Sequence, residues 1–266
     1  MKARSPRPRP QPALQRVADV QLRGRTGPLA TRVYWPAPPE SGLRPALLVL
    51  FPAGGSVAEG LDRADAVCRA VCRYVRVVVL AVSHRPAGQR FQAAALEDAL
   101  TATGWAADHA AELGADPGRL LVAGEAAGGR LAAAVALHAR DDGWPPVTRQ
   151  VLIRPELGAG HASSPRGGRD RHALPLEASS LKGVAAATVV TADHGPRFDD
   201  GRKYAALLRH AGVDVDELRD DGLPHDGASA PAGSPAERVV RDLARSLRRT
   251  LDAPPVEPGP HTDVPT

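Results

Sequence analysis

The stretch that decides the fold is Arg119-Leu120-Leu121-Val122-Ala123-Gly124-Glu125-Ala126-Ala127-Gly128-Gly129. Its apolar first half predicts a buried strand, and residues 130–138, which follow it, have the pattern of a helix. The glycines between the two indicate a tight turn, because a residue without a Cβ is needed where backbones approach closely. A buried strand that turns directly into a helix is typical of a mostly parallel sheet covered by helices.

The spacing of the glycines is that of a nucleophile elbow, Gly-x-Ser-x-Gly. In this strained strand-to-helix turn a nucleophilic side chain is held out above the sheet. The middle position here is Ala126, whose methyl group has no lone pair with which to attack a substrate. The sequence therefore indicates the scaffold and argues against the reaction that the scaffold usually performs.

Short apolar runs alternate with amphipathic segments through the rest of the chain. We expect strands at residues 17–22, 30–34, 46–51, 75–82, 120–123, 150–153, 188–192 and 213–218, and further helices at 61–74, 93–113, 200–211 and 235–251. This alternation favours one α/β domain over residues 14–251, between Pro-rich disordered tails at 1–13 and 252–266. Residues 156–173 lack periodicity, and we interpret them as a flexible cap-like insertion over the edge of the sheet where ligands bind.

Charge and composition exclude several classes of partner. The net charge is +4, but residues 1–25 hold seven Lys and Arg against one Asp, so the rest of the chain sums to −2 and we expect no nucleic-acid partner. No apolar run approaches the ~20 residues that span a bilayer, and no secretory signal is visible, so we expect a cytoplasmic protein without a membrane partner. Cys68 and Cys72 are interpreted as small core residues. The histidines show no ligand spacing, so neither a metal nor a cofactor is expected.

Four stretches of the chain resemble the hormone-sensitive-lipase-like branch of the α/β hydrolases, whose members are serine carboxylesterases. The elbow resembles the family's Gly-Asp-Ser-Ala-Gly-Gly, and Leu50–Gly55 stands where the family has His-Gly-Gly-Gly after a strand. Residues 84–99 resemble the family's Tyr-Arg-Leu-Ala-Pro-Glu segment and the helix after it, and residues 188–227 resemble its late triad segments. The resemblance implies an α/β-hydrolase fold, with a mostly parallel central sheet and helices on both faces. We expect a reduced cap, because the first family-like strand starts near residue 17.

The resemblance also assigns the catalytic positions. It places the family's nucleophilic Ser, triad Asp and triad His on Ala126, Gly195 and His225, so that only the histidine is retained. Glu125 replaces the family's Asp; it is expected to point sideways from the turn, and it is also a possible substitute catalytic group.

The ligand-binding positions follow from the family's oxyanion turn, which falls on Ala53, Gly54 and Gly55. Backbone N–H groups in this turn, together with that of Ala127, would bind the oxygen of an acyl group.

Three functions stay open at this stage, and whether the chain is an enzyme stays open with them. The leading hypothesis is a pseudo-esterase that binds a small acyl or carbonyl ligand, because loss of the nucleophile alone lowers kcat roughly a million-fold. The second is a repurposed enzyme, either a non-serine hydrolase or a lyase or isomerase, with His225 and Glu125 as acid and base. The third is a non-catalytic interaction subunit, in a homodimer or a heterodimer.

Overall fold

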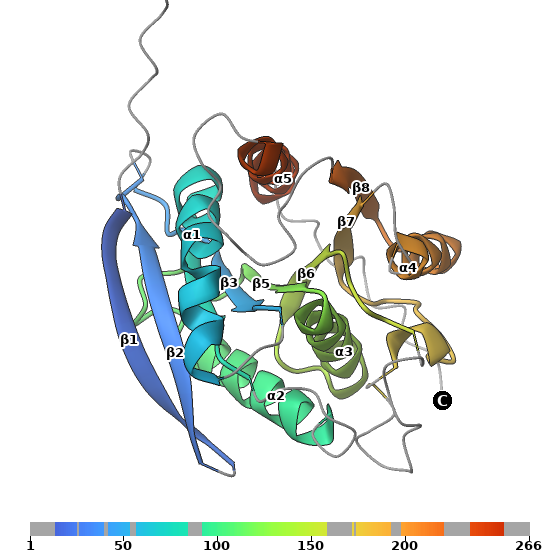
Figure 1. The fold of residues 1–266 in the computed structure, drawn as a ribbon, viewed down its shortest axis with the longest axis horizontal. Coiled ribbons are helices and arrows are strands. Elements are labelled where there is room, and N and C mark those ends of the chain that lie inside the picture. The colour runs from blue at the N-terminus through green and yellow to red at the C-terminus, as the bar shows by residue number, and fades with distance from the viewer. Residues whose placement is uncertain are drawn as a thin grey trace, which may run out of the picture.

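The computed structural model describes residues 14–25, 27–39, 42–53, 57–84, 92–158, 172, 174–192, 198–220 and 235–252. Within these residues the chain forms one eight-stranded sheet in the order β1-β2-β4-β3-β5-β6-β7-β8 (Figure 1). The strands are β1 (Leu14–Gly24), β2 (Gly27–Pro36), β3 (Leu47–Phe51), β4 (Val78–Val82), β5 (Leu120–Glu125), β6 (Val147–Ile153), β7 (Ala186–Ala192) and β8 (Val215–Asp220). The helices are α1 (Val57–Val75), α2 (Gln92–Asp108), α3 (Ala127–Asp142), α4 (Phe198–His210) and α5 (Pro235–Asp252), with a short 3-10 helix at Pro175–Glu177.

The sheet is mostly parallel, as the sequence predicts. Strand β2 runs antiparallel to both of its neighbours, β1 and β4, and every pair from β4 to β8 is parallel. All residues of β3 and β4 are buried. Strands that are covered on both faces read as continuous apolar runs, which is why these two were visible in the sequence.

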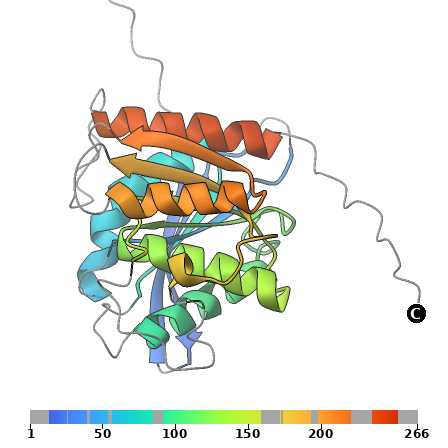
Figure 2. The same ribbon diagram turned by 90° about the vertical axis from the view of Figure 1, so that its right-hand side faces the viewer.

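Helices cover both faces of the sheet, and each face has its own core. Helices α1 and α5 lie on one face, and α2, α3 and α4 lie on the other (Figures 1 and 2). Side chains of β3 alternate between the two, so that Val49 and Phe51 join the α2/α3 core while Leu48 and Leu50 join the α1/α5 core. Figure 2 shows the edge of the sheet between α5 and α4.

Most predicted boundaries differ from the structure by a few residues, and two of them show why. The strand predicted at residues 75–82 starts at Val78, because α1 continues to Val75 and closes at Arg76 in a left-handed conformation with φ 64°. The helix predicted at residues 93–113 ends at Asp108 and continues as turns.

The predicted tails and most of the predicted insertion fall outside the described residues. These are residues 1–13 and 253–266, and residues 159–171 and 173 of the insertion. Two described residues of that stretch, Leu157 and His172, are buried.

Candidate functional site

The turn between β5 and α3 lies at the carboxyl edge of the sheet. It connects a central strand directly to the first turn of a helix. Ala126 links the two elements with φ 51° and ψ −114°, a conformation that residues with a Cβ rarely adopt. Its N–H donates to Ile153 O at 3.0 Å, and its carbonyl accepts from the N–H of Arg130 at 3.3 Å and of Glu156 at 3.1 Å. Hydrogen bonds to β6 and the segment after it therefore hold the strained turn.

The two glycines of the motif are required by close backbone contacts. A Cβ on Gly124 would lie 2.0 Å from Gly128 O, and a Cβ on Gly128 would lie 2.1 Å from Phe51 O. The spacing read from the sequence thus reflects a turn packed directly against β3. The structure places Ala126 in this turn, at the position that the motif gives to a nucleophile.

Backbone donors lie on either side of Ala126. No described side chain caps the N-terminus of α3, so the N–H groups of its first turn, Ala127 included, are left for other acceptors. Ala53 follows β3 and is partly exposed, whereas Gly54 and Gly55 lie outside the described residues.

The predicted oxyanion turn has a support that the sequence did not reveal. Its first residue, Pro52, stands where the family has a histidine, and the buried side chain of His84 donates from Nε2 to Pro52 O at 3.0 Å. His84 comes from the end of β4, next to β3 in the sheet, so a neighbouring strand provides the ring that fixes this turn.

Gly195 and His225, the remaining triad positions, lie outside the described residues, and their assignment stays a prediction. The strands before them, β7 and β8, end at Ala192 and Asp220. Both strands run parallel to β5, so they end at the edge of the sheet that carries Ala126.

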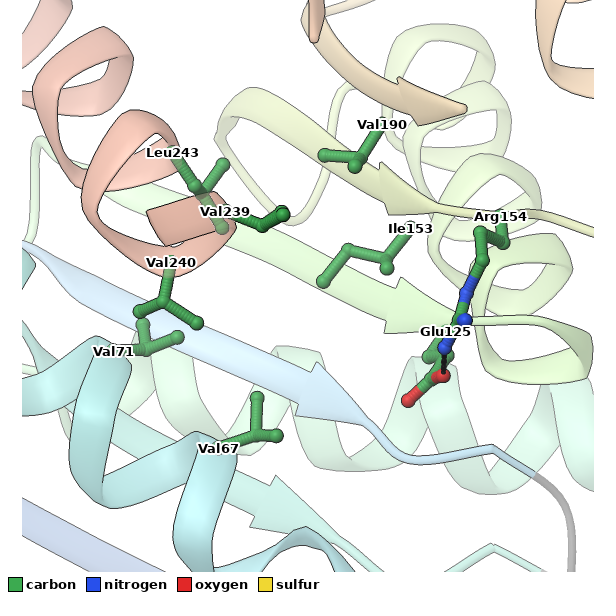
Figure 3. Close-up of a pocket in the computed structure, with 9 residues that line it drawn as sticks. All are labelled: Val67, Val71, Glu125, Ile153, Arg154, Val190, Val239, Val240 and Leu243. Carbon is green, nitrogen blue, oxygen red and sulfur yellow. Dashed lines mark hydrogen bonds and ion pairs between the residues drawn. The ribbon is translucent and has the colours of Figure 1, made fainter. Parts of the chain in front are cut away.

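Glu125 belongs to a buried ionic network. Its carboxylate pairs with Nη2 of Arg154 (Figure 3). Nη1 of Arg154 lies 3.5 Å from Oδ2 of Asp220. The side chains of Arg154 and Asp220 are 8% and 2% exposed, and that of Glu125 is 17% exposed. Glu125 thus leaves the turn sideways and is held by a cation, in a network that joins the ends of β5, β6 and β8.

A small cavity lies beside this network, between α1, α5 and the strand ends. Its volume is about 20 Å³, and its walls are aliphatic side chains with the Glu125–Arg154 pair at one end (Figure 3). A space of this size holds about one water molecule. It is therefore too small to receive an acyl ligand next to Glu125.

Arg130, in the first turn of α3, is a second buried cation that the sequence analysis missed. It is 6% exposed, and its Nε donates to Glu156 O at 2.6 Å. Burial lowers the pKa of Arg130, against the opposing effect of the carboxylates of Glu156 and Asp200. The signal in the sequence is a lone charge directly before the apolar run that starts at Leu131.

Three further features of the described residues concern metal binding, membrane spanning and the two cysteines. No described group of three His, Cys, Asp or Glu residues is arranged to hold a metal ion. None of the helices in the described ranges is both long and apolar enough to cross a membrane. Cys68 and Cys72 are fully buried, and burial raises the pKa of each thiol to about 12, which agrees with their interpretation as core residues.

A mostly parallel sheet with helices on both faces, and a strained glycine-flanked turn from a central strand into a helix, defines an α/β hydrolase. The family model for the alpha/beta hydrolase fold matches residues 48–170 and 161–229. The chain belongs to this family, in its hormone-sensitive-lipase-like branch, as its motifs predicted.

Esterases are among the proteins that the chain resembles. Esterase LipI of Mycobacterium tuberculosis is 34% identical over 237 residues, which cover 79% of this chain and 74% of LipI. The structure of EstE1, a thermophilic carboxylesterase from a metagenomic library, matches with a TM-score of 0.76 and 32% identity over 91% of each chain. The esterase of Pyrobaculum calidifontis matches with a TM-score of 0.73 and 31% identity, over 91% of this chain and 87% of its own. The fold prediction is confirmed, and the ancestry is that of an esterase.

Proposed function

We propose that this chain is a pseudo-esterase, which binds a small acyl or carbonyl ligand at the elbow and does not hydrolyse esters. Ala126 carries the proposal. It occupies the strained turn of a nucleophile elbow, with φ 51° and ψ −114°, and its side chain has no atom that can attack a carbonyl. In a serine hydrolase the loss of the nucleophile alone lowers kcat by roughly 10⁶.

Two described elements that could bind a ligand oxygen support the proposal. The N–H groups at the uncapped start of α3, with Ala127 first, point out of a helix whose dipole favours negative charge at this end. The turn at Ala53 is held by His84 through Pro52 O. An acyl oxygen placed between these two elements would accept hydrogen bonds without any bond being broken.

The acid–base alternative has less support. To act as a base, Glu125 would have to leave Arg154, and breaking a largely buried ion pair is costly. The cavity beside Glu125 is also too small for a substrate.

Hydrolysis of p-nitrophenyl butanoate by purified protein tests the catalytic half of the proposal. We expect the wild type and His225→Ala to be equal to each other and to buffer. The Ala126→Ser/Gly195→Asp variant should gain activity, and Ala127→Ser, which adds a hydroxyl one residue away, should not. Turnover by the wild type that His225→Ala or Glu125→Gln abolishes would overturn the proposal in favour of a repurposed enzyme.

Titration calorimetry with ethyl butanoate tests the binding half. Because the wild type leaves the ester intact, a single reversible binding isotherm is expected. Absence of any heat with this ester and with the corresponding ketones would contradict the proposed ligand class.

A further inference from the structure

Arg130 has no charged partner among the described residues. It is more than nine-tenths buried, its side chain forms one hydrogen bond, to the backbone oxygen of Glu156, and it forms no ion pair with any described residue. Its Nη2 is buried and has no hydrogen-bond partner in the described part of the structure. Buried guanidinium groups are normally paired, so an orphaned donor of this kind needs an explanation.

From its position in α3, the side chain of Arg130 is expected to lean toward the start of the helix. Long side chains of a helix lean toward its N-terminus, and Arg130 is the fourth residue of this helix. Its Nε bonds Glu156 O, and the N–H of Glu156 in turn bonds Ala126 O. The guanidinium therefore lies one hydrogen-bonded residue away from the elbow itself.

The two carboxylates nearest to Arg130 do not satisfy it. Asp200 accepts from the N–H groups of Leu157 at 3.0 Å and Gly158 at 2.7 Å, so one of its oxygens is already committed. Glu156 contributes its backbone oxygen to Arg130. Both carboxylates raise the pKa of Arg130 only through long-range electrostatics, and burial, which lowers this pKa, outweighs their effect.

We propose that the elbow end of α3 is a carboxylate-binding site, in which Arg130 is the charged donor and the uncapped N-terminus of the helix supplies backbone donors. The two observations are independent, since one concerns a side chain and the other the helix backbone. A guanidinium and a row of N–H groups match the two oxygens of a carboxylate. The proposal rests on the proposed function and narrows its ligand class: a small organic acid should bind more tightly than the corresponding ester.

Calorimetric titration of the full chain with sodium butanoate and with ethyl butanoate, in a buffer free of carboxylates, tests the site. We expect the acid to bind at least about tenfold more tightly than the neutral ester, because a hydrogen bond to a charged group is worth more than a neutral one. Arg130→Met should weaken butanoate binding by about tenfold or more and leave ester binding nearly unchanged. Arg238→Met, which removes an exposed arginine of α5, is the matched control and should bind as the wild type does.

Thermal unfolding without ligand supplies a second readout. Because Arg130→Met removes an unpaired buried charge and keeps most of the apolar volume, its melting temperature should equal or exceed that of the wild type. A large fall would give Arg130 a structural role, and butanoate binding by Arg130→Lys would then decide the inference. If this variant does not fold, Arg130→Lys, which keeps the charge and loses the planar fork, should still weaken butanoate binding.

The outcomes separate this inference from the proposed function. Equal affinity of the wild type and Arg130→Met for butanoate sinks the carboxylate site, while the absence of ester hydrolysis still supports a pseudo-esterase. Ester turnover by the wild type overturns the pseudo-esterase, and butanoate binding that depends on Arg130 would then still support the site.

Discussion

Replacing Ala126 by glycine should stabilise this protein, although it removes a methyl group. At φ 51° and ψ −114° a residue with a Cβ carries a strain of about 1–3 kcal/mol. Glycine relieves that strain, but it loses about 0.5–1 kcal/mol more backbone entropy on folding. We therefore expect a net gain of up to about 2.5 kcal/mol. For a domain of this size that corresponds to a rise of a few degrees in the melting temperature.

The matched control is Ala127→Gly. It removes the same methyl group from the next residue, which is also half-buried but stands inside the first turn of α3. There the backbone is helical and glycine is unfavourable, so this variant should lose up to about 1 kcal/mol. Chemical denaturation of both variants, with unchanged m-values, measures the difference. If Ala126→Gly loses as much stability as Ala127→Gly, the turn is not strained and the reasoning is wrong.

Three further predictions concern the surroundings. Gly128→Ala should fail to fold or lose more than about 3 kcal/mol of unfolding free energy, because its Cβ would lie 2.1 Å from a backbone oxygen of β3. Gly104→Ala, whose Cβ would have its nearest contact at 3.8 Å, should be neutral or stabilising by up to about 1 kcal/mol. Denaturant titrations that give the two variants equal stability would refute this prediction. Cys68 and Cys72, whose thiol pKa values are about 12, should react with 5,5′-dithiobis(2-nitrobenzoate) at pH 8 only after unfolding, so rapid labelling of the native protein would contradict their burial. The hydrogen bond from Arg140 is the main cause that lowers the pKa of Asp141 from its usual 3.8 to about 2. The contribution of this carboxylate to the stability of the fold is therefore fully present above about pH 4 and is lost as the pH falls toward 2. Asp141→Asn should therefore cost less than about 1 kcal/mol at pH 7, after allowance for solvent screening, and a difference from wild type that persists unchanged at pH 2–3 would show another cause.

The fold could be predicted because two of its central strands consist entirely of apolar residues. Strands β3 and β4 are buried on both faces, so no register or partner had to be known to find them. Boundaries were harder, because they depend on single backbone conformations. No sequence pattern around Arg76 indicates that this residue adopts φ 64° and ends α1.

The candidate site divides in the same way. Ala126 could be placed from the sequence. The close contacts that require glycine at Gly124 and Gly128 are made within one turn and between that turn and the neighbouring strand. The pairing of Glu125 with Arg154 could not be placed, because 29 residues separate the two and the register of β5 with β6 brings them together. A charged residue at the end of an apolar strand was the available signal. The assignments of Gly195 and His225 still rest on the motifs.

The ionic network at the strand ends constrains the order in which this protein can change. Arg154 contacts both Glu125 and Asp220, so a first substitution at Arg154 removes a cation from two largely buried carboxylates, whereas a first substitution at either carboxylate leaves the guanidinium in contact with the other. The three positions are therefore epistatic, with effects that are far from additive. Substitutions at these three positions should therefore be tolerated in one order and not in another, with a carboxylate replaced before Arg154.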